Sequence, residues 1–78
     1  MTLLQTLDTL EPGRRAVVVS LNAEGIERRR LLDLGFTRGS TVQVVRRSPC
    51  GDPTAFRIRE TTFALRADQS RRINVEPI

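Results

Sequence analysis

The stretch Arg30-Leu31-Leu32-Asp33-Leu34-Gly35-Phe36-Thr37-Arg38-Gly39 decides the fold that this sequence predicts. Its pattern is that of a helix that ends at a glycine, followed by a tight turn with a second glycine and the start of a strand. Gly35 fits the left-handed position that commonly ends a helix, and Gly39 fits a turn. Because the residues that follow are strand-like, this stretch ends the only substantial helix that we expect.

The predicted helix runs from Ile26 to Leu34. At about 100° per residue, Ile26, Arg30 and Leu34 fall along one face, with Leu31 beside them. An unpaired guanidinium is costly to bury. We therefore expect Arg30 either to donate hydrogen bonds to loop carbonyls near the two glycines, as a structural arginine, or to contact a partner.

The opposite side of this helix carries Leu32, with Arg28 and Arg29 before it. An apolar side chain between two arginines on an exposed face suits a docking surface. Isolated leucines are also ordinary on protein surfaces, so the pattern alone does not require a partner. Our hypothesis is that Arg28, Arg29 and Leu32 bind a partner protein.

Around this helix the sequence predicts a mainly β fold of about five short antiparallel strands. Short apolar or alternating runs between turn residues indicate the strands, which we place at Ala16–Leu21, Thr41–Arg47, Phe56–Arg59, Phe63–Leu65 and Ile73–Val75. The helix then lies between the first and second strands. Turns at such short intervals are typical of small barrels, in which closure removes exposed edges.

Two further segments have weaker patterns. Leucines recur at helical spacing in residues 3–10, before the Glu11-Pro12-Gly13 turn. We interpret these residues as an extended or one-turn lead-in whose leucines cover one end of the core. Residues 67–70 are interpreted as a polar bend.

Length and composition exclude several classes of protein. A chain of 78 residues predicts a single domain over residues 1–78. With one cysteine and no histidine, the chain has no internal disulfide, zinc finger or histidine-based acid–base chemistry. No glycine-rich phosphate loop or serine nucleophile motif is present, so we expect no enzymatic activity. Without a signal peptide or a long apolar run, a cytoplasmic location without membrane insertion is expected.

The charge pattern leaves a nucleic-acid-binding role open as an alternative. The formal net charge is +4, and all 13 basic residues are arginine, whose planar donors suit phosphates and carboxylates. Single-strand binders, however, combine such charges with exposed aromatic rings. Because we expect Phe56 and Phe63 in the core, a small basic nucleic-acid-binding barrel is only an alternative, and nucleic acid is not the expected partner.

The loop Pro49-Cys50-Gly51-Asp52-Pro53 has a proline at each end. Its stiffness lowers the entropic cost of binding, although it equally suits a rigid connection between two strands. We group Pro49, Gly51, Asp52 and Pro53 with Arg30, Gly35 and Gly39 as structural motif residues. Cys50 would be a redox or metal residue only with a basic group beside it.

Several of these stretches, in this order, resemble the FeoA family, ferrous iron transport protein A. The resemblance covers about residues 10–76. The matching stretches are Pro12-Gly13 before Ala16–Val19, Arg30–Phe36 with Gly39 and Val42–Val44, Pro49–Pro53, Phe63–Arg66, and Ile73–Val75. Two positions depart from the family pattern: Glu60 stands where a glycine often turns the chain, and Cys50 where an apolar residue is usual.

The resemblance implies an SH3-like barrel and a cytoplasmic accessory protein of bacterial ferrous iron uptake. The implied partner is FeoB, the membrane transporter with a cytoplasmic nucleotide-hydrolysing domain, which this protein would bind and modulate. The same fold is appended to metal-dependent repressors, so a metal-responsive module that acts through a dimer is a second alternative. We expect no cofactor, and leave open a transition metal ion held by carboxylates or between two chains, and a weak homo-oligomer.

Overall fold

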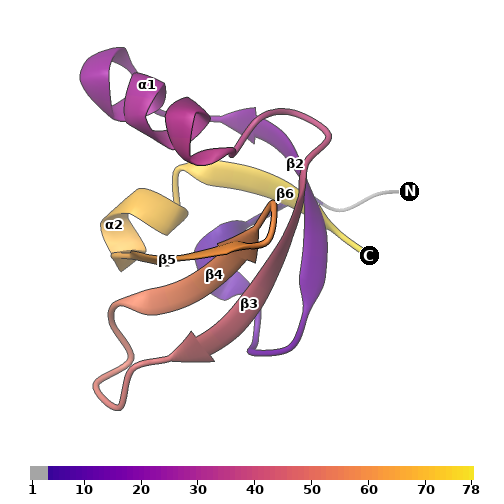
Figure 1. Ribbon diagram of the computed structural model, residues 1–78, viewed down its shortest axis with the longest axis vertical. Coiled ribbons are helices and arrows are strands. Elements are labelled where there is room, and N and C mark those ends of the chain that lie inside the picture. The colour runs from indigo at the N-terminus through magenta and orange to yellow at the C-terminus, as the bar shows by residue number, and fades with distance from the viewer. Residues whose placement is uncertain (1–3) are drawn as a thin grey trace.

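Six strands form one antiparallel sheet in the order β1-β6-β2-β3-β4-β5 (Figure 1). The coordinates are a computed structural model, which describes residues 4–78. The strands are β1 (Gln5–Thr6), β2 (Arg15–Leu21), β3 (Thr41–Arg47), β4 (Thr54–Ile58), β5 (Thr61–Leu65) and β6 (Ile73–Pro77). The helical segments are the 3-10 helix η1 (Leu7–Thr9) and the α-helices α1 (Gly25–Leu34) and α2 (Ala67–Ser70).

Alternation along the strands builds the core. On β3, Val42 and Val44 are fully buried, and they lie opposite Ile58 and Phe56 of β4. Side chains that alternate along a strand point to one face of the sheet, so these four residues share the inner face. The remaining buried apolar residues are Leu7, Leu10, Ala16, Val18, Ala23, Leu31, Phe36, Leu65, Ile73 and Val75.

Two β-bulges interrupt the ladders. The register of β2 against β6 shifts between Val18 and Ser20, and that of β3 against β4 shifts between Val44 and Arg46. A bulge adds one residue to a strand, bends it and increases its twist. The bulges therefore help to curl the sheet around its core.

The end of α1 has the predicted geometry. Gly35 has a φ of 113°, and the N–H of Phe36 donates to the carbonyl of Leu31 at 3.1 Å. This bond satisfies one of the carbonyls that the end of a helix leaves free. Gly39, with a φ of 90°, then turns the chain into β3. The sequence-based expectation for both glycines is confirmed.

The face of α1 that packs on the sheet differs from the prediction. Leu31 is the buried residue of α1, and Leu34 packs partly against the core. Ile26, placed on the same face by its spacing, is 82% exposed. The N-terminal turn of α1 projects beyond the sheet (Figure 1), so its apolar side chain has no sheet surface to cover.

The count of strands corrects the prediction of five. Residues 5–6 pair with β6, Gln5 lying opposite Val75, where we expected only a lead-in. Consequently α1 lies between the second and third strands, not the first and second. Residues 67–70 form α2 instead of a bend. A strand of two residues and a helix of four are too short for any periodicity to reveal.

The prediction that the sheet closes into a barrel was also wrong. β1 and β5 form the two edges and do not pair with each other. β1 is only two residues long because the chain enters η1 at Leu7, which leaves too little strand to close the sheet. Of the lead-in leucines, Leu7 and Leu10 are buried as expected, Leu4 is 59% exposed, and Leu3 lies outside the described residues.

Leu31 and Ile26, which helical spacing places on the same side of α1, should contribute very differently to the stability of the fold. Leu31→Ala should lower the free energy of unfolding by about 2–5 kcal/mol, because it opens a cavity in the core. Ile26→Ala, the matched control on the same helix, should change it by less than about 0.5 kcal/mol. Urea unfolding of both variants measures the difference, and equal losses would contradict this packing of α1.

Candidate partner-binding surface

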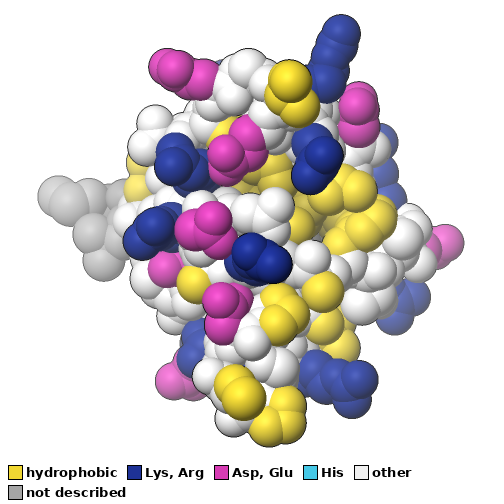
Figure 2. All heavy atoms as spheres, turned by 90° about the vertical axis from the view of Figure 1, so that its left-hand side faces the viewer, with side chains coloured by type: hydrophobic (Ala, Val, Ile, Leu, Met, Phe, Trp, Pro, Cys, Tyr) yellow, Lys and Arg dark blue, Asp and Glu magenta, His cyan; other side chains and the backbone are white. Residues whose placement is uncertain are grey.

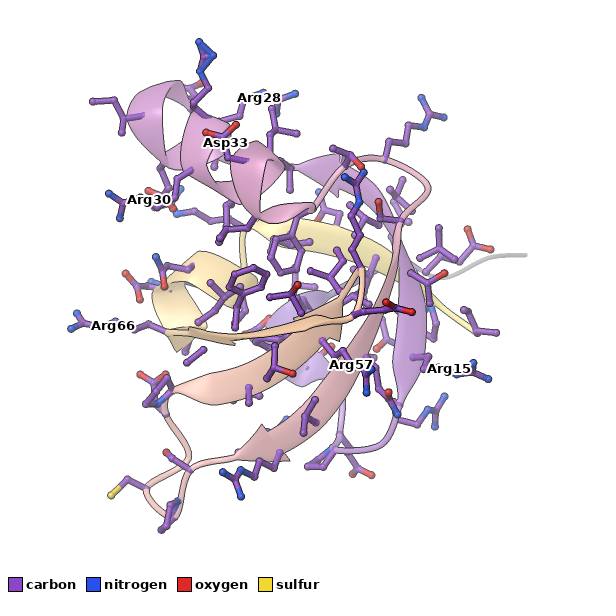
Figure 3. The ribbon with its side chains drawn as sticks, in the orientation of Figure 1. Arg15, Arg28, Arg30, Asp33, Arg57 and Arg66 are labelled. Carbon is purple, nitrogen blue, oxygen red and sulfur yellow. The ribbon has the colours of Figure 1, made fainter. Side chains whose placement is uncertain are left out.

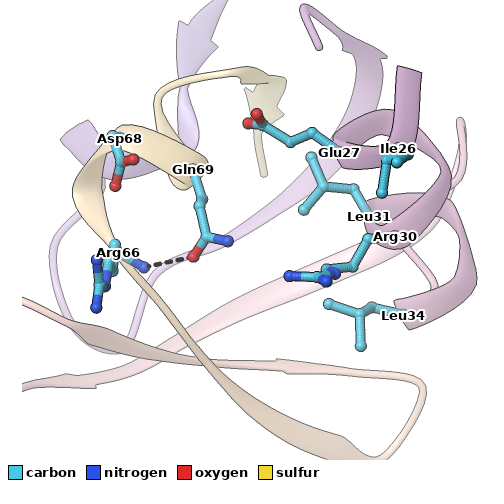
Figure 4. A pocket seen from close by; sticks show the side chains of 8 residues that line it. All are labelled: Ile26, Glu27, Arg30, Leu31, Leu34, Arg66, Asp68 and Gln69. Carbon is cyan, nitrogen blue, oxygen red and sulfur yellow. Dashed lines mark hydrogen bonds between the residues drawn. The ribbon is translucent and has the colours of Figure 1, made fainter. Parts of the chain in front are cut away.

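A groove of about 500 Å³ separates α1 from α2 (Figure 4). Its walls combine apolar and charged side chains, namely Ile26, Glu27, Arg30, Leu31, Leu34, Arg66, Asp68 and Gln69. Figure 4 shows the guanidinium of Arg30 pointing from α1 toward α2, with Arg66 on the opposite wall. Within residues 4–78, no hydrogen bond or ion pair holds the guanidinium of either arginine.

Of the two carboxylates that line the groove, one has an ion-pair partner among the described residues. Glu27 forms an ion pair with Arg72, whose Nε lies 3.2 Å from Oε1 of Glu27. A backbone bond of 2.6 Å, from the N–H of Asn22 to the carbonyl of Arg72, holds the same two segments together. Asp68 is exposed on α2. The groove therefore offers two unpaired guanidinium groups beside one unpaired carboxylate.

Hydrogen bonds to α2 fix the far wall of the groove. Oε1 of Gln69 accepts from the backbone N–H of Arg66 at 3.0 Å, and Oδ1 of Asp52 accepts from the N–H of Ala67 at 2.9 Å. Asp52 belongs to the loop of residues 49–53, so its hydrogen bond connects this loop to the start of α2. The structure thus gives Asp52 a structural contact, as its grouping among the motif residues suggests.

A second, smaller hollow of about 280 Å³ lies between α1 and β2, and Leu32 and Arg28 line it together with Arg38. Leu32 is half-buried here, whereas the sequence suggested an exposed side chain. Nη1 of Arg28 donates to the carbonyl of Leu21 at 3.3 Å. Arg29 is exposed and does not line the hollow. The structure thus brings two of the three proposed partner-binding residues together.

Arg59 takes the structural position that we considered for Arg30. Its Nη2 donates to Oγ1 of Thr37 at 3.0 Å, and its Cδ would lie 3.3 Å from a Cβ placed at Gly35. Arg59 lies in the β4–β5 turn with a φ of 50°, far in the sequence from the helix end. Nothing in the sequence pattern indicated this contact or the place of Arg66 in the groove.

Arginines and carboxylates are interspersed on the face that Figure 2 shows, around a patch of apolar side chains. Within residues 4–78, no three cysteine or acidic side chains lie close enough to hold a metal ion, and Cys50 is exposed. No helix in this part of the chain is long and apolar enough to cross a membrane. What the described surface offers is apolar contact framed by guanidinium groups, which suits recognition of another protein.

The curled, unclosed sheet and this surface define a small SH3-like domain. The family model described as the FeoA domain matches residues 5–77, and the chain belongs to the FeoA domain family. A solution structure of FeoA from Chlorobium tepidum superposes with a TM-score of 0.89 at 36% identity, over 95% of this chain and 70% of that one. A zinc complex of FeoA from Stenotrophomonas maltophilia, described as a prokaryotic SH3 domain protein, has a TM-score of 0.82 at 36% identity, over 91% of this chain and 88% of that one.

Two curated relatives differ greatly in length relative to this chain. A fusion of Fe(2+) transport protein A with the Fe(2+) transporter FeoB, from Porphyromonas gingivalis, is 38% identical over 92% of this chain. This chain spans only 8% of the length of that fusion protein. A protein of Campylobacter jejuni described as a putative Fe(2+) transport protein A is 29% identical over 94% of this chain and 99% of its own length.

The contact of Asp52 with α2 can be tested by stability measurements. Asp52→Ala should lower the free energy of unfolding by about 1 kcal/mol, because the N–H of Ala67 loses its acceptor. Asp33→Ala is a matched control, since an acidic group in the last turn of a helix opposes the helix dipole and its removal costs nothing. The midpoints of urea unfolding compare the two variants, and an unchanged midpoint for Asp52→Ala would contradict a stabilising bond.

Proposed function

We propose that this protein is an accessory protein of ferrous iron uptake that binds the cytoplasmic part of the FeoB transporter and modulates it. Membership of the FeoA family and the relative that joins both proteins in one chain support this proposal. Joining two proteins raises their effective concentration without any new contact. Where the two proteins are separate chains, the accessory protein must hold its partner through its own surface, and it would work in the cytoplasm, where that part of the transporter lies.

The observation that carries the proposal is the exposure of α1. This helix anchors itself to the core through Leu31 and leaves Ile26 82% exposed on the groove side. Leu32 and Arg28 border the hollow on its other side. Apolar residues framed by arginines are the composition expected at the centre of a protein interface. We therefore assign the transporter contact to α1, with Arg28, Arg29 and Leu32 as proposed contact residues beside Ile26 and Arg30.

The two flanks of α1 separate this proposal into testable parts. Each of Ile26→Glu and Arg30→Glu tests the groove, while Leu32→Glu and the double variant Arg28→Glu/Arg29→Glu test the other side. A flank that contacts FeoB should show at least about tenfold weaker binding, as expected for the loss of a central interface residue. Binding to the purified cytoplasmic part of FeoB from the same organism measures the effect.

Arg15→Glu is the matched control for charge. Arg15 is exposed on β2 and points away from α1 (Figure 3), so its reversal should leave binding unchanged. Because Leu32 is half-buried, an NMR spectrum of Leu32→Glu must first show that the fold is intact. If every folded α1 variant bound FeoB as well as the unmodified protein, the assignment of the contact to α1 would be wrong.

Two other roles stay predictions. A metal-responsive role would require carboxylates from two chains around one ion, and would appear as dimerisation on addition of ferrous iron or zinc. Nucleic-acid binding would appear as a mobility shift that weakens steeply with salt. The FeoB proposal expects neither response.

A further inference from the structure

The outer edge of β5 lacks the devices that usually protect the edge of a sheet. β5 has the sequence Thr-Thr-Phe-Ala-Leu, without charge or proline, and lies at one end of the strand order. Natural edge strands are commonly shortened, charged or interrupted by proline, because their free N–H and C=O groups can pair with another chain. β1, at the other end of the order, is protected by being only two residues long. β5 is therefore the edge at which a further strand can add.

The β4–β5 hairpin determines which backbone groups face this edge. Arg59 and Glu60 form a two-residue turn with φ values of 50° and 66°, and Ile58 lies opposite Thr61. The two residues that flank such a turn form a hydrogen-bonded pair, in which each backbone donates to and accepts from the other. Along the hairpin, hydrogen-bonded and non-hydrogen-bonded residue pairs then alternate. It follows that Thr62 and Ala64 direct their N–H and C=O groups away from β4, and both residues are exposed.

We propose that β5 pairs with β5 of a second copy of this chain, antiparallel across a two-fold axis at Phe63. Thr62 then lies opposite Ala64 of the second copy, and the two residues exchange both backbone hydrogen bonds. The symmetry repeats this pair on the other side of the axis, as in any isologous interface. The outward groups on each strand thus match those that the other strand requires.

Charge complementarity favours a second copy of this chain as the partner of β5, paired in this register. With the axis at Phe63, Glu60 of each copy lies opposite Arg66 of the other. Both side chains are exposed, and neither forms an ion pair within residues 4–78. Opposite charges across two strands stabilise their pairing, whereas like charges oppose it. An axis one residue later, at Ala64, would instead bring Glu60 opposite Asp68.

Phe63 adds an apolar contact at the axis. Its ring is only partly buried against the core. In the proposed dimer the two Phe63 residues form a non-hydrogen-bonded pair, the kind in which side chains of neighbouring strands approach most closely. Aromatic pairs across strands add to stability. One strand per copy is far smaller than a standard interface of about 1,600 Å², so we expect a weak, concentration-dependent dimer.

Sedimentation equilibrium of the purified chain, with a metal chelator and without FeoB, tests the pairing. The average mass should rise toward that of a dimer up to about 1 mM, as expected for a weak interface. Glu60→Arg and Arg66→Glu should each weaken dimerisation by about tenfold, because each places like charges at both ends of the paired strands. The double variant Glu60→Arg/Arg66→Glu restores opposite charges and should dimerise within about twofold of the unmodified chain.

Matched controls exclude a general effect of net charge. Glu76→Arg and Arg15→Glu make the same changes on β6 and β2, at exposed positions away from β5, and should not alter dimerisation. Thr62→Pro removes an outward N–H that makes no bond to β4, a position where an edge strand tolerates proline. The variant should fold, as its NMR spectrum can verify, and stay monomeric.

Several results would overturn the self-pairing. These are a monomer at every concentration, a dimer that the chelator removes, and a dimer that ignores both charge reversals. A monomer whose β5 amide signals shift only when FeoB is added would assign this edge to the transporter instead. Because the measurement uses the chain alone, its failure leaves the proposed binding of FeoB by α1 untouched.

Discussion

The end of α1 at Gly35 is the constraint on which the rest of the domain depends. The left-handed backbone at this glycine lets the N–H of Phe36 reach back to the carbonyl of Leu31. One hydrogen bond thereby orients two of the largest fully buried side chains, Leu31 on the helix and Phe36 just after it. The same turn receives Arg59 from the β4–β5 hairpin, so helix, core and hairpin meet at one point.

Sequence patterns predicted the elements that are long enough for an apolar pattern to repeat along them. β3 was predicted with its observed limits, Thr41–Arg47, and α1 to within one residue, because alternation, helical spacing and a glycine stop all act locally. β1 and α2 were missed because two and four residues are too few for a pattern to repeat. Closure of the sheet was predicted wrongly because it depends on how far the first strand extends, which no local rule specifies.

The candidate surface was less predictable than the fold, for a physical reason. Helical spacing gives the angle of a side chain around α1 but not the extent of the sheet beneath it. Ile26 is exposed because the helix extends beyond the sheet, and Leu32 is half-buried because β2 lies beside it. Arg66 faces Arg30 only through the tertiary fold. Residues on one helix can be grouped by sequence, but residues on two helices cannot.

The position of β6 has a consequence for how the chain folds. This strand comes from the last residues of the chain, yet it lies between β1 and β2, and Asn74 hydrogen-bonds to Ser20 from the far end of the sequence. Contacts between distant residues carry a large entropic cost of loop closure and slow folding. On the ribosome, β1 would have no neighbour to pair with until the C-terminal residues had emerged. The sheet is therefore completed only after residues 73–77 have been made, by a strand inserted into its interior instead of one added to its edge.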